Sequence, residues 1–464
     1  MSDDRSPLDA YRRKRSGDRT AEPFGGDASP DGRPGDAPRL FVVQMHAARR
    51  LHWDLRLEID GVLRSWAVPR GPSFDPAVKR LAVETEDHPL EYVDFEGIIP
   101  EGNYGAGAMI VWDRGVWVAL EPVDEGYGAG KLLFELRGHK LRGVWTLVRT
   151  KGTAGGGRPG RAGAGGKEWL LIKKPDEAAH GPPPDDRSIL SGLSIEELRR
   201  GADRAASVRA RLQALGASRR PVDPAGLSLM LAETREEPFS REGWLFELKY
   251  DGYRLLAARP GGQARLRYRS GVDATHAFPE IARAVTALPF GGLVLDGEVV
   301  VLDDDARPNF QRLQKRALLQ RRHDLARAMR EHPVCYYAFD LLAFEDFDLR
   351  DLPLWQRKEI LQQLLPPSGA LRFADHVPER GLELFALVRQ RRLEGMVAKK
   401  ADSVYVGRRS AHWVRIRIES SDDFVIIGFT EPEGTRGARG SLHRAAFRGA
   451  RPVYAGRGGS GLTD

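Results

Sequence analysis

Residues 51–59 read LHWDLRLEI, a run in which apolar and polar side chains alternate. Successive side chains of a β-strand point to opposite faces of a sheet, so the pattern predicts a strand with one apolar face against a core. His52, Asp54, Arg56 and Glu58 then share the other face. Imidazole and carboxylate groups are ligands for divalent metals, and a guanidinium binds phosphate oxygens through paired N–H donors. We interpret this face as a candidate metal and phosphate site rather than as a solvated strand face.

The composition favours an intracellular protein of several domains. A chain of 464 residues is too long for one core, and 41% hydrophobic residues support globular folding. A net charge of +7 is compatible with a polyanionic partner. Cys335 is the single cysteine, which excludes an intrachain disulfide and a zinc ribbon. The N-terminus is charged where a signal peptide needs an apolar core, and no stretch of about 18 apolar residues occurs, so we expect a cytoplasmic protein without a membrane partner.

Patterns along the chain predict a multidomain α+β protein. Short strands separated by turn signals are typical of a mostly β domain, and a mixture of strands and helices follows later in the chain. Between them, Ser194 and Glu197 have the spacing of a capping box at the start of one helix-like segment, 194–216. The expected segments are a flexible arm (1–38), a mostly β domain (39–175), a linker (176–224), an α+β domain (225–418) and a further domain (419–464).

The first group of candidate site residues surrounds the alternating strand. His46 lies six residues before His52 and can reach it from the preceding strand. Together with Asp54 these side chains supply two imidazoles and a carboxylate, enough for a catalytic divalent ion with open positions. A single histidine is more often an ordinary partly buried residue, so the interpretation depends on the whole group. Further polar side chains of the same region extend it, namely Arg56, Ser65, Arg70, Arg80, His88 and Tyr92.

These residues occur in a stretch that is similar to a known family. Residues 41–107, from FVVQMHAARRLHWDLRLEI to PEGNYGAG, resemble the 3′-phosphoesterase module of the bacterial DNA ligase D proteins, and the match spans most of 39–175. The resemblance implies a compact β-barrel that removes a 3′-terminal ribonucleotide or 3′-phosphate from a primer. It also implies a manganese ion on His46, His52 and Asp54.

The same resemblance implies roles for other side chains of the module. Arg56, His88 and Tyr92 would engage the phosphate, with His88 a candidate for transition-state stabilisation. Glu22 would help to bind the terminal nucleotide. Arg70 stands where the family more often has lysine, and a planar guanidinium differs from a compact ammonium in how it meets phosphate.

A second group of candidate residues begins at residues 246–254, FELKYDGYR, which contain the pattern K-x-D-G. Alone, this pattern is weak, because a lysine at a strand end before a turn also produces it. A covalent nucleotidyl transferase needs an amine nucleophile, acidic groups for metal and ribose, an aromatic face for the base and cations for the α-phosphate. The downstream chain supplies them as Glu298, Phe339, Glu394, Lys399 and the segment WVRIR at 413–417.

Their order and spacing resemble the ATP-dependent DNA ligase family, with the ligase D subgroup fitting best, over residues 225–464. The resemblance implies that Lys249 attacks the α-phosphate of ATP, with Mg²⁺ or Mn²⁺, and becomes lysyl-AMP on the way to sealing a nick. It implies DNA ends and nicks as partners, together with the bacterial Ku end-binding protein, and a nucleoid-associated location. The site residues that it assigns are Glu247 at the adenine edge, Arg254 and Glu298 near ribose and metal, Arg269 near the phosphates, Phe339 stacked on adenine, and Glu394 on a metal.

Two features depart from the ligase pattern. Ligases of this kind usually carry W-x-K-x-K, and both lysines are here arginines, Arg415 and Arg417. Residues 419–464 resemble only the first half of the OB-fold that follows the adenylation domain, so we expect a longer parent chain. The departures leave three hypotheses: an end-joining enzyme with both activities, a phosphoesterase with a weak or inactive ligase domain, and a non-catalytic scaffold for DNA ends. A capping-enzyme or RNA-ligase interpretation leaves 39–175 unexplained.

Overall fold

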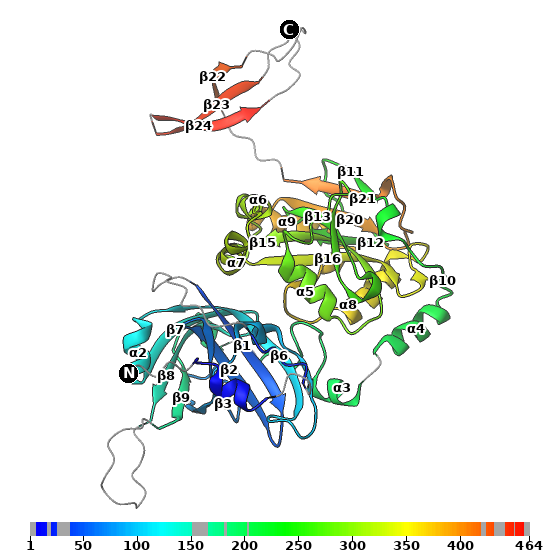
Figure 1. The fold of residues 1–464 in the computed structure, drawn as a ribbon. Helices are drawn as coiled ribbons and strands as arrows, with labels where there is room; N and C mark the ends of the chain where they lie inside the picture. Colours follow the sequence, from blue (N-terminus) through cyan, green and yellow to red (C-terminus); the bar gives the residue numbers. More distant parts are fainter. Residues whose placement is uncertain are drawn as a thin grey trace, which may run out of the picture. The chain divides into compact units, whose positions relative to one another are not determined.

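The alternating segment is strand β2 (Leu51–Ile59) of a closed β-barrel (Figure 1). Strand β1 (Arg39–Ala47) pairs antiparallel with β2 and also with β6, and this second pairing closes a ring within a nine-stranded sheet. The mostly β domain predicted from the sequence is therefore a barrel. The ring continues from β2 through β3 (Val62–Val68), β4 (Arg80–Glu84), β9 (Glu168–Lys173), β8 (Arg142–Arg149), β7 (Lys131–Gly138) and β6 (Gly107–Ala119), while β5 (Gly97–Ile99) is added to β6 beside the ring.

The computed structural model describes most of the chain. The chain divides into two compact units, residues 1–416 and 417–464. Among the described residues, no helix has the length and apolar character needed to cross a bilayer. The described ranges are 6–15, 20–25, 38–150, 166–180, 183–201, 204–418, 424–430, 441–449 and 451–458.

Both faces of β2 are largely buried. Leu55, Leu57 and Ile59 join the barrel core, as the alternation predicts, although Leu51 at the strand end is 43% exposed. The polar face is also covered, since Asp54, Arg56 and Glu58 are at most 6% exposed. Buried charged groups need partners, so the row of ionisable side chains on β2 belongs to a connected polar network.

Part of the predicted flexible arm is ordered, which corrects that prediction for residues 6–15 and 20–25. Helix α1 (Asp9–Arg13) contributes Tyr11, which is fully buried and donates a hydrogen bond to the carbonyl of Pro23 at 2.7 Å. This order could not be predicted from the sequence, because one buried aromatic residue in a short, charged segment gives no apolar periodicity.

Two helices replace the single helix predicted between the domains. The capping box is confirmed: Ser194 caps α3 (Ile195–Arg200), and the Glu197 side chain accepts the backbone N–H of Ser194. Gly201 then adopts a left-handed conformation with φ 57° and ends the helix. Helix α4 (Arg204–Ala214) follows as a separate element. Glycine is the residue that takes this conformation without a Cβ penalty, and it explains the break.

The α+β region predicted after the linker consists of two sheets with helices. The seven-stranded sheet has the order β10 (Ser218–Arg219), β17 (Phe347–Asp348), β16 (Val334–Phe344), β15 (Leu293–Val301), β13 (Tyr253–Ala258) and β14 (Arg265–Tyr268), with β18 (Leu371–Phe373) beside β16. The five-stranded sheet has the order β11 (Leu231–Thr234), β21 (Arg409–Arg417), β20 (Gly395–Lys400), β12 (Trp244–Leu248) and β19 (His376–Pro378). The helices are α5 (Pro279–Ala287), α6 (Phe310–Ala317), α7 (Arg322–Glu331), α8 (Leu354–Leu364) and α9 (Gly381–Gln390).

A buried ion pair ties α8 to the first of these sheets. The guanidinium of Arg357 donates to both carboxylate oxygens of Asp340, at 2.7 and 2.8 Å, and both side chains are completely buried. We expect Arg357→Met to destabilise the region by about 3–5 kcal/mol, because it leaves Asp340 buried without its countercharge. Differential scanning calorimetry of this variant and of the double variant Asp340→Asn/Arg357→Met checks this. The double variant should recover part of the loss, and a single variant as stable as wild type would contradict the expectation.

The second unit contains an antiparallel sheet of β22 (Val425–Phe429), β23 (Leu442–Arg448) and β24 (Arg451–Gly458). Several of its large apolar side chains are exposed, including Ile426, Phe429 and Tyr454. A three-stranded meander is compatible with the start of an OB-fold, and that assignment stays a prediction.

Candidate active sites

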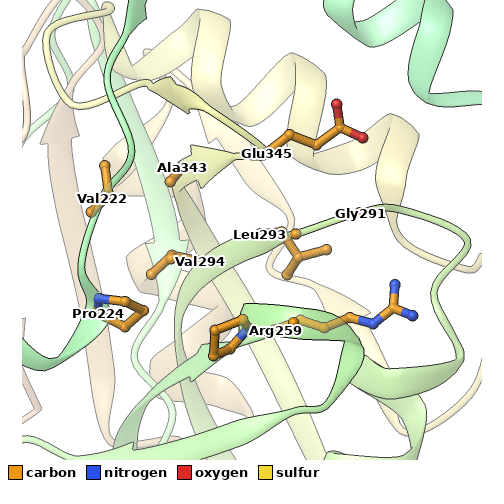
Figure 2. A pocket seen from close by; sticks show the side chains of 11 residues that line it. Val222, Pro224, Arg259, Gly291, Leu293, Val294, Ala343 and Glu345 are labelled. Carbon is orange, nitrogen blue, oxygen red and sulfur yellow. The ribbon is translucent and has the colours of Figure 1, made fainter.

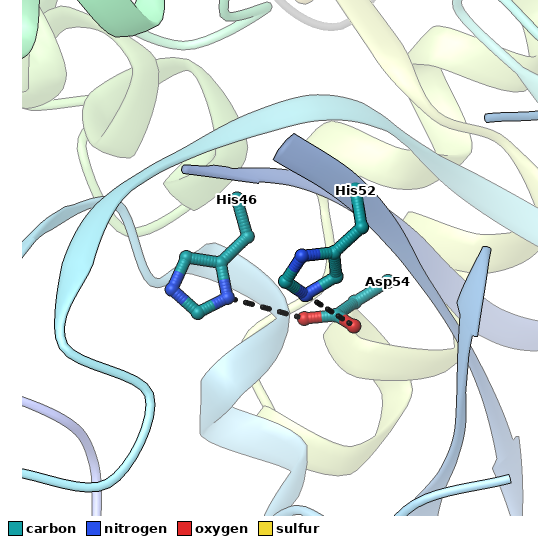
Figure 3. Close-up of side chains that lie close together, drawn as sticks. All are labelled: His46, His52 and Asp54. Carbon is teal, nitrogen blue, oxygen red and sulfur yellow. Dashed lines mark ion pairs between the residues drawn. The ribbon is translucent and has the colours of Figure 1, made fainter. Parts of the chain in front are cut away.

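The candidate metal ligands meet at one end of the β1–β2 ladder. The antiparallel register places His46 directly opposite His52 and Gln44 opposite Asp54, so these side chains share one face. One ligand atom from each of His46, His52 and Asp54 lies within 4.8 Å of the others (Figure 3). Nδ1 of His46 is 3.7 Å from Oδ2 of Asp54, and Nε2 of His52 is 3.5 Å from Oδ1. The predicted triad is therefore assembled.

Backbone carbonyls fix which ring nitrogen each histidine offers. His46 donates through Nε2 to the carbonyl of Gly105 at 2.8 Å, and His52 donates through Nδ1 to the carbonyl of Arg50 at 2.9 Å. The other nitrogen of each ring then lacks a proton in the neutral tautomer and faces Asp54. This second layer of hydrogen bonds is typical of metal-bound histidines. The donor set fits a divalent cation.

Arg56 is the centre of the buried network beside the triad. Its guanidinium donates to Asp54 at 2.9 Å, to the side-chain carbonyl of Gln44 at 2.7 Å and to the hydroxyl of Ser65 at 2.9 Å. Burial disfavours the charged form of Asp54, but Arg56 and the two histidines outweigh it and hold the pKa of Asp54 well below its ordinary value. Asp54 is therefore ionised at neutral pH, as a metal-binding carboxylate needs to be, and Arg56 is immobilised next to the candidate metal position.

His88 lies on the far side of Arg56. Nη1 of Arg56 is 2.9 Å from Nδ1 of His88, and the Tyr92 ring is 4.7 Å from the His88 ring. Burial, together with the positive charges of Arg56 and Arg15, holds the pKa of His88 well below its ordinary value. The imidazole is therefore neutral at pH 7 until an anion is bound nearby, which would favour its protonation.

The N-terminal segment completes this site with a residue that sequence reasoning missed. Arg15 lies 3.4 Å from Nε2 of His88 and donates to Glu22 at 2.9 Å. Glu22 in turn accepts the hydroxyl hydrogen of Tyr92 at 2.7 Å. Glu22, predicted for the nucleotide, is thus 3% exposed and bound within the cluster. Of the two further cations considered, Arg70 is exposed and Arg80 is half-buried.

The candidate nucleophile of the second region, Lys249, follows directly after β12. Its Nζ forms an ion pair with Glu394 at 2.5 Å, and its backbone N–H donates to the carbonyl of Gly395 at 3.0 Å. The side chains of both partners remain partly accessible, at 19% and 25%. The pair brings together the K-x-D-G lysine and the glutamate predicted to hold a metal.

Glu298 is the second predicted metal carboxylate, and it lies across the ladder from Arg254. Burial raises the pKa of Glu298 to about 8, Arg254 and Lys249 oppose this, and the nearby carboxylates Asp296 and Glu394 add to it. Carboxylates that repel one another in this way are suited to share a cation. Glu298 and Glu394 would hold a divalent ion close to Lys249.

Arg254 is fixed by a residue that the sequence did not single out. Asp296, completely buried, accepts two hydrogen bonds from Arg254 at 3.0 and 2.7 Å and a third from the Tyr405 hydroxyl at 2.7 Å. The Arg254 guanidinium lies 5.3 Å from the centre of the Phe339 ring. Arg254 and Phe339, both predicted for the nucleotide, are therefore neighbours.

Phe339 has close neighbours on more than one side. Nζ of Lys399 lies 4.1 Å from the Phe339 ring centre and 4.3 Å from that of Trp413, whose ring packs edge-on against Phe339. Trp413, 2% exposed, begins the WVRIR segment but was not itself assigned a role from the sequence. Lys399 also binds Glu247, so the structure brings together most of the residues predicted for the nucleotide.

The other predicted cations are exposed or half-buried. Arg269 is exposed in the turn after β14. Arg415 and Arg417 are each two residues apart from the next along β21, so they share the strand face that carries Trp413. Nε of Arg415 donates to the hydroxyl of Thr234 at 2.8 Å, and Arg417 is exposed.

A pocket of about 360 Å³ lies elsewhere in this region and contains none of the predicted site residues (Figure 2). Its charged side chains are already engaged: Arg259 donates to the backbone carbonyl of Leu288 at 2.6 Å, and Glu345 pairs with Arg209 at 3.0 Å. We assign no function to it.

Both candidate sites lie in domains that are similar to known proteins. Residues 44–149 match the DNA Ligase D 3′-phosphoesterase domain, and residues 229–417 match the ATP dependent DNA ligase domain. The multifunctional non-homologous end joining protein LigD of Pseudomonas aeruginosa is 39% identical over 98% of this chain. This chain belongs to the DNA ligase D family. The resemblance inferred from the two groups of residues is thereby confirmed.

A second curated relative agrees with this membership. The multifunctional non-homologous end joining DNA repair protein LigD of Mycobacterium tuberculosis is 34% identical over 98% of the chain. The chain spans about half the length of these curated relatives, 53% and 51%. A solved mycobacterial DNA ligase D complexed with ATP and MES is 32% identical and covers 52% of this chain and 75% of its own, with a TM-score of 0.39. An ATP-dependent ligase domain implies ATP and a divalent metal as cofactors.

Proposed function

We propose that the chain is an end-joining repair enzyme with two activities: a metal-dependent 3′-phosphoesterase and an ATP-dependent DNA ligase. The observation that carries the proposal is the convergence of His46, His52 and Asp54 within a domain of the phosphoesterase family. The substrates would be DNA ends and nicks, the partner the bacterial Ku protein and the location the nucleoid. Manganese is the proposed metal of the phosphoesterase, and Mg²⁺ or Mn²⁺ that of the ligase.

In the phosphoesterase site, the chain's own residues bind and orient the phosphate. When bound, a divalent ion supplies charge neutralisation and an activated water. Arg56 donates to a phosphate oxygen, and its bonds to Gln44 and Ser65 preserve the orientation of its fork. His88, neutral in the free site, gains a proton beside the bound anion and stabilises the transition state. Tyr92 and Glu22 position the 3′ end.

In the ligase site, Lys249 attacks the α-phosphate of ATP, forms the lysyl–phosphorus bond and releases pyrophosphate. Separation of Lys249 from Glu394, followed by transfer of the ammonium proton to water, frees the amine for attack. Phe339 and Glu247 hold adenine, while Arg254 and Glu298 contact the ribose. Arg269, Lys399, Arg415 and Arg417 supply positive charge.

A second candidate function is a phosphoesterase with a weak ligase domain. The observation that favours it is the hydrogen bond from Arg415 on β21 to Thr234 on the paired strand β11, which engages the guanidinium. A missing contact to the transition state costs on the order of a hundredfold in rate.

We expect Arg415→Lys/Arg417→Lys to accelerate AMP-adduct formation about tenfold or more, because a slim ammonium without the Thr234 tether reaches the α-phosphate more closely. Single-turnover labelling with α-labelled ATP and magnesium measures the rate. Arg409→Lys, an exposed change earlier on β21, is the matched control. Equal rates for the double variant and wild type would show that the arginines do not limit adenylation.

The experiment that tests the proposed function uses two substrates with the whole chain. A primer with a 3′-phosphate or 3′-ribonucleotide should acquire a 3′-hydroxyl when manganese is present. Nicked DNA with ATP and magnesium should be sealed, slowly. Sealing without end processing would contradict the phosphoesterase assignment, and processing without any protein–AMP adduct would favour the second candidate.

A further inference from the structure

Glu247 of the ligase domain lies between two ammonium groups. Nζ of Lys358 is 2.8 Å from Oε1 of Glu247, and Nζ of Lys399 is 2.7 Å from Oε2. All three side chains are at most 3% exposed. Burial disfavours the charged carboxylate, yet the two lysines outweigh it and lower the pKa of Glu247.

Lys358 is held more rigidly than an isolated ion pair requires. It projects from α8, where its ammonium also donates to the carbonyl of Ala374 at 3.0 Å and approaches that of Phe339 at 3.5 Å. These contacts use the three donor hydrogens of the ammonium. Lys358 therefore has little freedom to approach a phosphate, unlike a cation that recognises triphosphate.

The carboxylate that Lys358 fixes is part of the nucleotide site. Glu247 precedes Lys249 by two residues, and its other lysine, Lys399, lies over the rings of Phe339 and Trp413. Burial and the positive charge of Lys358 lower the pKa of Lys399 to about 8. A buried cluster with two ammonium groups and one carboxylate carries a net positive charge, which favours the ionised form of Glu247.

We propose that Lys358 is a positioning residue for base specificity: it keeps Glu247 ionised and oriented, so that the site accepts a purine with a 6-amino group and rejects a purine with a 6-carbonyl group. The inference rests on the proposed function, in which ATP binds beside Lys249. An ionised carboxylate can only accept hydrogen bonds, and the 6-amino group of adenine donates one. Hypoxanthine presents a carbonyl oxygen to the same carboxylate, and a site built for a donor rejects such an analogue strongly.

Lys358→Met tests the inference in the full chain. Adduct formation is measured under single-turnover conditions with α-labelled ATP and with α-labelled ITP. The apparent KM for ATP should rise about tenfold or more, since one charged hydrogen bond to Glu247 is lost. The preference for ATP over ITP should fall by a similar factor, and the maximal rate with ATP should stay within about threefold, because Lys249 and its metal carboxylates are unchanged.

Matched variants separate positioning from other effects. Lys400→Met removes the same charge from the position that follows Lys399, where the ammonium pairs with the exposed Asp402, and should leave KM and base preference unchanged. Lys358→Gln retains a donor and should preserve more of the ATP preference than methionine does. It also decides the matter if a thermal melt shows that Lys358→Met does not fold.

The outcomes are distinguishable. An unchanged KM and ATP preference in Lys358→Met, or a loss of maximal rate alone, would overturn the inference while leaving the proposed function intact. The inference would also be wrong if Lys358→Gln lost the preference for ATP over ITP as completely as a residue without a hydrogen-bond donor does. A wild-type chain that forms no adduct with ATP would overturn the proposed function itself, and this inference with it.

Discussion

Asp54→Asn is expected to reduce manganese-dependent removal of a 3′-phosphate by more than about a hundredfold. Loss of a residue that only hydrogen-bonds to a metal ligand already costs about 10- to 100-fold in metal affinity or activity, and Asp54 would bind the metal directly. The change removes the one charged ligand of the triad and the carboxylate partner of Arg56. Gel analysis of a labelled primer measures the activity, and the manganese content of the purified protein gives a second readout that does not depend on turnover.

Asp60→Asn is the matched control for this variant. Asp60 is exposed in the turn after β2 and has φ 52°, a conformation that asparagine also tolerates. It should retain wild-type activity. If Asp54→Asn binds manganese and processes ends as well as Asp60→Asn does, the metal site has been assigned to the wrong residues.

Lys249→Ala is expected to abolish the covalent AMP adduct, a loss of more than about a thousandfold, because Lys249 supplies the amine at the end of β12 that attacks the α-phosphate. Sealing of ordinary nicked DNA should disappear with it. Sealing of a nick that already carries AMP on its 5′-phosphate should persist, since that step no longer needs the lysine. The measurement compares the two substrates in one assay.

Lys315→Ala, an exposed change on α6, controls for the loss of a positive charge. It should leave both substrates sealed at the wild-type rate. Residual adduct in Lys249→Ala above that of heat-denatured protein would show that another side chain can act as nucleophile.

The convergence of His46, His52 and Asp54 could be predicted from the sequence because the period of a strand is two. Once LHWDLRLEI is placed in a strand, His52, Asp54 and Arg56 must share a face, and a hairpin brings His46 opposite. Periodicity says nothing about what covers that face. Arg15 was therefore missed: it comes from a segment without apolar repeats and reaches His88 through tertiary packing.

The ligase site was predicted less completely for the same reason. Lys249, Glu298 and Glu394 occur in short motifs with recognisable chemistry, and the structure places Lys249 and Glu394 in contact. Asp296, Lys358 and Trp413 contact other predicted residues, Arg254, Glu247 and Phe339 respectively. Those contacts depend on strand pairing and helix packing, which the spacing of residues along the chain does not give. The break of the predicted linker helix at Gly201, by contrast, was missed although a glycine within a helical segment is a recognisable stop signal.

The most direct test of the account is to map the modified residue after incubation of the wild-type chain with ATP and magnesium. Intact-mass spectrometry should show a species heavier by one AMP, and fragmentation of its peptides should place the AMP on Lys249. AMP on Lys358, Lys399 or another residue, or no adduct at any ATP concentration, would contradict the proposal that this site forms lysyl-AMP.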